Sequence, residues 1–297
     1  MTDNDTHADL AAAHAAFHRS RRRLFGIAYR MLGSVADAED ILQEVWIRWQ
    51  NADRREVVEP AAFLSTVTTR LSINSLQSAH SRRETYVGPW LPEPVNTEDD
   101  PALGAERAEA LQYAVLLLLE RLTPTERAAY VLREALEYPY ERIAAVVQTM
   151  DTAARQLVSR ARKHLASERR ADAPVADQRK LLSAFLAAAQ NGDVRQLEQL
   201  FTADVVSYTD GNGAKLAARI PVHGASRVAQ FVTAFSSHFW AGKSLGWAEV
   251  NGQPAVTLSE EGTVTTVLTL TATAEGITRL LWVMSPDKLR HVANVGA

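Results

Sequence analysis

LTPTERAAYVLREALEYPYERIAAVVQTMDTAARQLVSRARKHL, residues 122–165, decides the fold of the N-terminal half of this chain. Thr123 supplies an N-cap hydroxyl, Pro124 suits the first helical position, and Glu126 completes a capping box, so a helix is predicted to begin at Pro124. Pro139 opens a second helix, and a third helix follows after a four-residue break. Three short helices in this order are typical of a helix-turn-helix.

The third helix of this motif, predicted over residues 152–165, has a thin apolar stripe and a broad polar face. The face is almost free of acids, because Asp151 lies at its start and Glu168 beyond its end, whereas an ordinary solvated helix mixes both signs. Arg and Gln on such a helix can form paired hydrogen bonds with purine edges in the major groove, and later Arg and Lys can neutralise phosphates. The candidate DNA contacts are Thr149, Thr152, Arg155, Gln156, Ser159, Arg160, Arg162 and Lys163. On the first helix, the side chains expected to face water are Arg127, Arg133 and Glu134.

The composition limits the number of domains, the cysteine chemistry and the cellular compartment that the chain can have. The chain has 297 residues with ordinary apolar and charged content, which predicts about two domains, each with its own core. It contains no cysteine, which excludes disulfides, thiol nucleophiles and Cys-ligated zinc and is compatible with the cytoplasm. No signal peptide and no membrane-spanning apolar run is present in the sequence. We therefore expect a cytoplasmic protein that does not enter a membrane and carries no cofactor and no metal.

The composition and residue pattern of the sequence change three times along the chain. Residues 8–84 have a helical pattern, and residues 85–104 are rich in Pro, Gly and acidic side chains, as expected of a linker. Residues 105–170 are helical again, and residues 178–297 change to alternating strands. The predicted organisation is two all-α modules followed by an α+β domain.

The first helical module presents two polar surfaces. One is an acidic ridge on its second helix, formed by Asp37, Glu39, Asp40, Gln43 and Glu44, which needs either a basic partner or plain solvent. The other is the polar side of a helix that begins at Pro60, a surface that can hold a nucleic-acid strand or simply remain solvated. Its members are Arg70, Asn74, Gln77, Arg82 and Arg83.

With these residues in view, the N-terminal half resembles the extracytoplasmic-function (group IV) sigma factors, which direct bacterial RNA polymerase to promoters. AYRMLGSVADAEDILQEVWIRW (28–49) is similar to the core-binding part of region 2, and AAFLSTVTTRLSINSLQSAHSRRE (61–84) is similar to its promoter-melting helix. Residues 122–165 are similar to region 4. YVGPWLPEPV (86–95) contains WLPEP, a mark of the members with a fused C-terminal SnoaL-like domain.

This resemblance implies partners and roles. Asp37, Asp40, Gln43 and Glu44 would dock on core RNA polymerase. The loop from Asn51 would capture a flipped base of the −10 element, whose single strand would lie along the polar surface of the Pro60 helix. Region 4 would read the −35 element as duplex. Gln148 and Met150 stand where relatives usually carry a glycine and a capping serine, so capping of the recognition helix is expected from Thr149 or Asp151.

The C-terminal region predicts two helices, then a curled antiparallel sheet interrupted by a third helix around Val228–Phe235, an α+β cone that resembles the SnoaL-like, nuclear-transport-factor-2-like fold. Strands are expected over residues 205–209, 248–250, 255–258, 263–273 and 277–284, with hairpin turns at Asn251–Gly252 and Glu275–Gly276. The resemblance implies a regulatory domain that contacts the linker or region 2 and encloses a pocket for a small ligand. The residues expected at this regulatory contact are Trp90, Leu91, Pro92, Glu93, Pro94, Asp210, Gly211, Gly213, Asn251, Gly252 and Pro254.

Two other functions stay open at this point. The helix-turn-helix could belong to an operator-binding regulator with a ligand-sensing cone, although such a protein needs no melting module. The cone could also be a small-molecule enzyme that uses Asp210, His223 and His238 as acid and base. Asp210 has a simpler explanation, because aspartate is common in Gly-rich turns. The sigma factor, which is not an enzyme, is the interpretation that accounts for all three modules.

Overall fold

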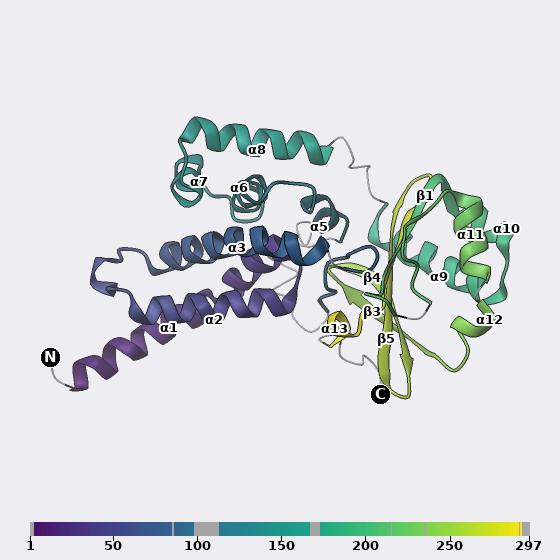
Figure 1. Ribbon diagram of the computed structural model, residues 1–297, viewed down its shortest axis with the longest axis horizontal. Helices are drawn as coiled ribbons and strands as arrows, with labels where there is room; N and C mark the ends of the chain where they lie inside the picture. The colour runs from purple at the N-terminus through teal and green to yellow at the C-terminus, as the bar shows by residue number, and fades with distance from the viewer. Residues whose placement is uncertain are drawn as a thin grey trace. The chain divides into compact units, whose positions relative to one another are not determined.

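The computed structural model describes residues 3–84, 86–97, 113–166, 173–214, 216–234, 236–290 and 292 (Figure 1). The chain forms two compact units. The helical unit combines residues 1–82 and 118–168, and the sheet unit combines residues 83–117 and 169–297. The described part of the predicted linker, residues 86–97, therefore groups with the C-terminal strands.

The first part of the helical unit is built from three long helices. Gly33, at φ 67°, ends the first, and the hydroxyl of Ser34 caps the second by accepting a hydrogen bond from the Asp37 N–H at 3.1 Å. Buried Trp49 ties these two helices together, because its indole N–H donates to the Ala13 carbonyl at 3.0 Å. The elements are α1 (Asp3–Leu32), α2 (Val35–Asn51), the short 3-10 helix η1 (Arg54–Glu56) and α3 (Pro60–Glu84).

The helix-turn-helix is confirmed as three short helices in the order predicted. The capping box of Thr123 and Glu126 is present, and the first helix begins at Pro124. Pro139 is the N-cap residue of the second helix, which begins one position later. The elements are α5 (Tyr113–Leu119), α6 (Pro124–Glu134), α7 (Tyr140–Val147) and α8 (Asp151–Ala166). The three helices from α6 on share a small apolar core, with Ala129, Leu132, Ile143 and Val158 among its members.

The turn before α8 contains two residues that are uncommon at their positions, Gln148 and Met150. Gln148 is left-handed, with φ 57° and ψ 53°, a conformation that glycine adopts with less strain. Helix α8 begins at Asp151, which places Met150 at the N-cap position with 73% of its side chain exposed. Neither Thr149 nor Asp151 occupies the N-cap position, so that part of the sequence expectation was wrong.

The sheet unit has one mixed sheet of six strands in the order β2-β1-β6-β5-β4-β3. Strands β1 and β6 pair in parallel, whereas an antiparallel sheet was expected, because the long intervening chain lets the two strands meet without a hairpin. β1 starts at Phe201, ahead of the predicted strand, and β2 was not predicted. The strands are β1 (Phe201–Asp210), β2 (Val222–His223), β3 (Ser244–Val250), β4 (Gln253–Glu260), β5 (Thr263–Thr273) and β6 (Gly276–Val283). The helices are α9 (Val175–Asn191), α10 (Val194–Leu200), α11 (Ala225–Ala234), α12 (Ser236–Phe239) and α13 (Pro286–Leu289).

Two-residue turns set the register of the antiparallel strands. Asn251 and Gly252 join β3 to β4 with φ values of 54° and 70°, as a type I′ turn requires. The turn expected at Glu275–Gly276 lies one residue earlier, because Gly276 already belongs to β6. A Cβ at Gly276 would lie 2.7 Å from the Leu200 carbonyl oxygen, so this position accepts only glycine without a backbone shift.

The two faces of the sheet are covered by different parts of the chain. Helices α9, α10 and α11 cover one face, where Phe185 packs on Trp282 (Figure 1). Leu91 from the linker and Tyr113 from α5 are buried in the apolar cluster on the other face. Because side chains alternate along a strand, β6 contributes to both clusters. The linker therefore completes the hydrophobic core of the C-terminal domain.

Candidate functional site

Helix α8 presents one uninterrupted polar stripe to solvent. The buried side of the helix consists of Ala154, Val158, Ala161 and Leu165. The exposed residues at the same three- and four-residue spacing on the opposite side are Thr152, Gln156, Ser159 and Lys163. This stripe is the part of the predicted −35 surface that points directly away from the core, and Gln156 lies near its middle.

The arginines of α8 flank this stripe and are paired with carboxylates. Arg155 Nε lies 2.9 Å from Asp151 Oδ2, and its guanidinium stacks 4.4 Å from the centre of the Tyr140 ring. On the same helix, the Arg162 guanidinium lies 2.7 Å from Glu134 of α6, a hydrogen bond that raises the pKa of Arg162. The expectation of a nearly acid-free surface considered one helix only, and the carboxylates come from the neighbouring helix as well.

Two further candidates of the −35 surface lie at its margins. Arg160 Nε is 3.5 Å from Glu126 Oε1, while most of the arginine side chain is exposed. Thr149 is half-buried in the turn, where its N–H donates to the Ala144 carbonyl at 2.9 Å. The eight predicted residues thus differ in their surroundings. Four form the exposed stripe, three arginines are paired with carboxylates, and Thr149 is half-buried in the turn.

The acidic ridge lies on α2. Asp40 and Gln43 are exposed, whereas Asp37 and Glu44 are half-buried. The Glu44 carboxylate accepts a hydrogen bond from Arg48 at 2.8 Å on the same helix. Glu39 forms an ion pair of 2.6 Å with Arg21 of α1, so α1 neutralises part of the ridge.

The polar surface of α3 is only partly open. Asn74 and Gln77 are exposed, but Arg70 donates to the Ala145 carbonyl at 2.9 Å and to the Val146 carbonyl at 3.0 Å. Those carbonyls belong to the last turn of α7, so a predicted −10 residue is bound to the helix-turn-helix. The side chains of the other two predicted residues, Arg82 and Arg83, lie outside the described residues.

The segment between α2 and α3 contains the predicted base-capture loop. Asn51 is exposed at the last position of α2. Asp53 caps η1, and hydrogen bonds from Arg55 lower the pKa of the Asp53 carboxyl. Val58 in this segment is 99% exposed.

Arg127 is the residue of the helical unit that sequence patterns placed wrongly. It is only 2% exposed rather than facing water, and its Nε donates to the Arg30 carbonyl of α1 at 2.9 Å. Its guanidinium also pairs with Glu120 at 2.6 Å. Burial lowers the pKa of Arg127. Since Arg127 belongs to α6, this cation fastens the helix-turn-helix to α1.

In the sheet unit, Asp210 forms the centre of a buried polar cluster at the end of β1. Its side chain is 0% exposed, so it is not the solvated turn residue that its Gly-rich surroundings favoured. Oδ2 accepts a hydrogen bond from the Leu91 N–H at 2.7 Å and lies 2.6 Å from Lys288 Nζ. The Tyr86 hydroxyl donates to Oδ1. Burial and the Asp210 charge raise the pKa of Tyr86.

Lys288 completes this cluster from the other end of the domain. Its ammonium donates to the Leu91 carbonyl and lies 4.1 Å from the centre of the Trp90 ring and 5.1 Å from that of Tyr86. Cation–π contacts of this kind stabilise a desolvated ammonium. Lys288 was not among the predicted contacts.

The β3–β4 turn forms a second contact with the linker. Asn251 exchanges two hydrogen bonds with Val95, in which Asn251 Oδ1 accepts from the Val95 N–H at 3.0 Å and the Asn251 N–H donates to the Val95 carbonyl at 2.9 Å. The Gly252 N–H donates to the Thr97 hydroxyl at 3.0 Å. Asn96 adds an isolated β-bridge to Val250 at the sheet edge.

The remaining predicted linker-contact residues have other surroundings. A Cβ at Gly211 would lie 2.3 Å from the Ala217 Cβ, so this glycine allows the loop to fold back. Nothing lies within 4 Å of the Cβ position of Gly213. Pro254 is buried in β4, where its carbonyl accepts from Thr269 at 3.0 Å. Pro92, whose carbonyl accepts from the Tyr113 hydroxyl, is buried together with Glu93 and Pro94.

The three residues of the enzyme alternative have separate surroundings. The Asp210 carboxylate is occupied by linker groups, while His223 on β2 and His238 on α12 have exposed side chains. Among the described residues, no group of three His, Asp or Glu side chains is placed to hold a metal ion. Within the same part of the chain, no helix has the length and apolar character to cross a membrane.

Comparisons with known proteins agree with this architecture. The family model of Sigma-70 region 2 matches residues 16–82, and that of Sigma-70 region 4 matches residues 112–165. The ECF RNA polymerase sigma factor SigJ of Mycobacterium tuberculosis is 38% identical over 231 residues, which cover 76% of this chain and 74% of that protein. The probable ECF RNA polymerase sigma factor SigI of the same species is 31% identical over 279 residues, covering 93% and 94%. The crystal structure of M. tuberculosis SigJ superposes with a TM-score of 0.76 at 32% identity and covers 95% of this chain and 99% of that chain. The chain therefore belongs to the extracytoplasmic-function sigma factors of RNA polymerase.

Proposed function

We propose that this sigma factor is controlled through the linker between its two DNA-binding regions, which the C-terminal domain holds as part of its own fold. The observation that carries the proposal is the cluster of Asp210 and Lys288 on both sides of the Leu91 peptide group. A sigma factor must bring regions 2 and 4 to two separate promoter elements at once. Fixing residues 86–97 on the sheet restricts the length of chain available for that separation.

For the −35 element, we assign base contacts to the outward stripe of α8, with Gln156 at its centre and Thr152 and Ser159 beside it. Arg155 and Arg162 have their charge partly compensated by Asp151 and Glu134, so their role is phosphate binding at the flanks of the groove. Arg160 and Lys163 extend the same cationic surface. Thr149 positions the turn.

For the −10 element, we assign strand binding to Asn51, Arg70, Asn74 and Gln77, together with Arg82 and Arg83. Arg70 must first leave the carbonyls of α7, since a guanidinium engaged by two backbone acceptors is not free to bind phosphate. The contacts of Arg70 and Arg127 therefore characterise a closed form of the helical unit. Binding to polymerase would open it, with the ridge of Asp37, Asp40, Gln43 and Glu44 docked on the core enzyme.

The test is run-off transcription with purified core polymerase and the full chain. Asp210→Ala should release the linker and change the yield of promoter-specific transcript. Asp287→Ala is the matched control, because Asp287 is an exposed aspartate near the same cluster that pairs only with Arg290 among the described residues. Equal yields from the wild type and the Asp210→Ala variant would show that the linker contact does not control activity.

Truncation after about residue 170 is a second test, but it changes the apolar core as well as the linker contact. Removing the strands of the sheet unit deprives Leu91 and Tyr113 of the apolar face on which they are buried. A truncated chain would expose both side chains and lose solubility for reasons unrelated to regulation. The Asp210→Ala variant separates loss of the linker contact from loss of solubility, because it leaves the sheet in place.

We assign the C-terminal domain a binding role rather than a catalytic one, in a protein that works in the cytoplasm with core polymerase and promoter DNA. Asp210 is occupied by the linker, and the side chains of the two histidines of the enzyme alternative are exposed. A small ligand in the cone would bias the linker contact.

A further inference from the structure

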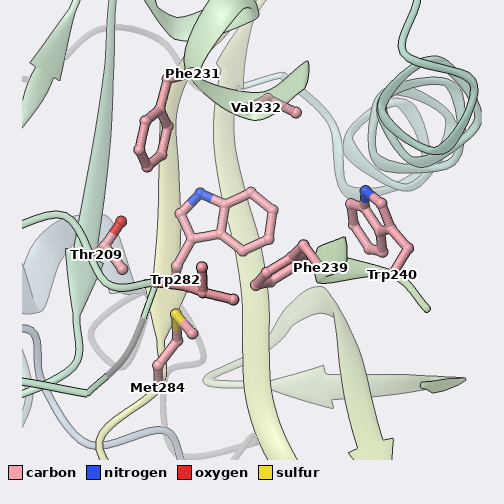
Figure 2. A pocket seen from close by; sticks show the side chains of 8 residues that line it. Thr209, Phe231, Val232, Phe239, Trp240, Trp282 and Met284 are labelled. Carbon is pink, nitrogen blue, oxygen red and sulfur yellow. The ribbon is translucent and has the colours of Figure 1, made fainter. Parts of the chain in front are cut away.

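A pocket opens between α11, α12 and the sheet, on the face of the sheet opposite to the linker (Figure 2). About 400 Å³ of space lies against its walls, part of it open solvent, so the pocket is half-open rather than an enclosed cavity. The lining is apolar and mostly aromatic. It consists of Thr209, Leu216, Phe231, Val232, Phe239, Trp240, Trp282 and Met284.

The rings of this pocket are arranged around Trp282. Figure 2 shows its indole in the middle, with Phe231 on one side and Phe239 and Trp240 on the other. Phe239 meets Trp282 edge to face at 5.5 Å, and Trp240 is tilted to it at 6.3 Å. Aromatic groups prefer such edge-to-face and offset contacts, so an aromatic ligand finds favourable partners on several sides.

The polar groups of the pocket define the chemistry of its ligand. None of the lining residues carries a charge. The Trp282 N–H is already used, since it donates to the Ser207 hydroxyl at 3.2 Å. In the described part of the chain, the Thr209 hydroxyl and the Trp240 N–H have no hydrogen-bond partner. A charged ligand would lose its hydration here without compensation, whereas a neutral one with an acceptor oxygen would not.

Leu216 supplies an independent sign that the pocket is a built site. It contributes a large apolar side chain that is 46% exposed, from a backbone held at φ 68°. A leucine in this left-handed conformation costs about 1 to 2 kcal/mol, and such strain concentrates at ligand-binding sites. A glycine or asparagine would relieve the strain, but it would remove the apolar wall.

The geometry points to a binding site for a neutral, aromatic small molecule, whose occupancy is transmitted to the linker through β1. Thr209 lines the pocket and the next residue, Asp210, holds the linker on the other face, because side chains alternate along a strand. Met284 also lines the pocket, and its N–H donates to the Asp210 carbonyl at 2.7 Å. A ligand that displaces Thr209 or Met284 therefore displaces Asp210. The transmission rests on the proposed control through the linker, whereas the binding site does not.

The binding site is tested with N-phenyl-1-naphthylamine, a neutral aromatic fluorophore, and the purified full chain. Its sulfonated analogue has the same rings and a negative charge, so it should bind at least about tenfold more weakly. Trp240→Ala should weaken the neutral probe by about tenfold, and Trp247→Ala should not. Trp247 is the matched control because it lies on β3 beneath Arg179, outside the pocket. Equal affinity of both probes, or of both variants, would overturn the proposal.

A second measurement needs no variant and covers the case in which Trp240→Ala does not fold. Hydrogen exchange of the wild-type chain should slow in residues 209 and 282–284 when the neutral probe is added. The same experiment reports the linker, because the Leu91 N–H is bonded to Asp210. A change in Leu91 exchange on probe binding supports transmission, and unchanged Leu91 exchange at saturation refutes it. Neither result depends on transcription, so failure here leaves the promoter function untouched.

Discussion

The Asp210→Ala substitution gives the sharpest test of how the linker is held. The carboxylate that it removes is fully buried and compensates the buried ammonium of Lys288 at 2.6 Å. Breaking a buried ion pair from one side costs about 3 to 5 kcal/mol, because the remaining charge is left without compensation. The Leu91 N–H also loses a charged acceptor, and this loss overlaps with the first because all three groups touch. We expect the sheet unit to lose about 3 to 5 kcal/mol of stability.

The double variant Asp210→Ala with Lys288→Met separates the two contributions. Methionine fills much of the volume of the lysine chain without a charge, so the cost of the stranded ammonium disappears. The Leu91 N–H still lacks its acceptor and the Leu91 carbonyl loses its donor, and buried unsatisfied groups of this kind cost about 1 to 3 kcal/mol. The double variant should therefore be more stable than the single one and remain about 1 to 3 kcal/mol below the wild type.

The assay is native-state hydrogen exchange of amides in β1 and β6, which yields the free energy of opening of the sheet unit separately from the helical unit. Asp287→Ala is again the control, since an exposed ion pair contributes about 0 to 1 kcal/mol. The reasoning is refuted if Asp210→Ala costs less than about 1 kcal/mol, or if adding Lys288→Met restores none of the loss.

Three further predictions concern the DNA-reading surface and the linker. Met150→Ser places a capping hydroxyl at the start of α8 and should stabilise the helical unit by about 1 kcal/mol, measured by urea unfolding; an unchanged midpoint would contradict this assignment of the helix start. Gln156→Ala should cost about 1 to 3 kcal/mol in promoter binding by the holoenzyme and relax the preference at one −35 base pair, whereas Lys163→Ala should weaken all sequences alike; a uniform loss for both would make Gln156 a backbone contact. The pKa of Tyr86 is raised above its usual value of 10.0, so its contribution to linker stability is complete below pH 10 and falls as the pH rises further. Because amide exchange is base-catalysed at every site, the measured quantity is the protection factor of the Leu91 N–H, which should fall in that range in the wild type and not in Tyr86→Phe. Equal profiles would exclude Tyr86 ionisation as the cause.

The helix-turn-helix could be predicted from sequence because its determinants are local. Thr123 and Glu126 lie within one turn of each other, and the structure forms the capping box that their spacing requires. The departures at Gln148 and Met150 were also visible in the sequence. What they do to the backbone was not, since the left-handed residue and the helix start depend on the packing of α8 against α6 and α7.

The residues that were missed or misplaced depend on contacts distant in the sequence. The spacing of apolar residues in α6 puts Arg127 on its wet side, but α1 covers that side and supplies the Arg30 carbonyl 97 positions away. Lys288 contacts Leu91, which lies 197 positions away in the sequence. The parallel pairing of β1 with β6 involves no hairpin turn, so no local turn sequence predicts it. The periodicity of apolar residues within one helix or strand predicts which of its faces is buried, but not which side chains of another element pack against the other faces.

A buried ion pair at the linker is compatible with the proposed release of the linker. Apolar residues of the same volume would hold the Leu91 segment at least as firmly, since desolvation cancels much of the attraction between Asp210 and Lys288. The two designs differ once the linker leaves. Exposed apolar side chains would oppose the open form through the hydrophobic effect, whereas a carboxylate and an ammonium regain their hydration as water enters. Release still exposes Leu91, which is buried in the apolar cluster, but the charged cluster adds less to the cost of release than further apolar side chains at the positions of Asp210 and Lys288 would.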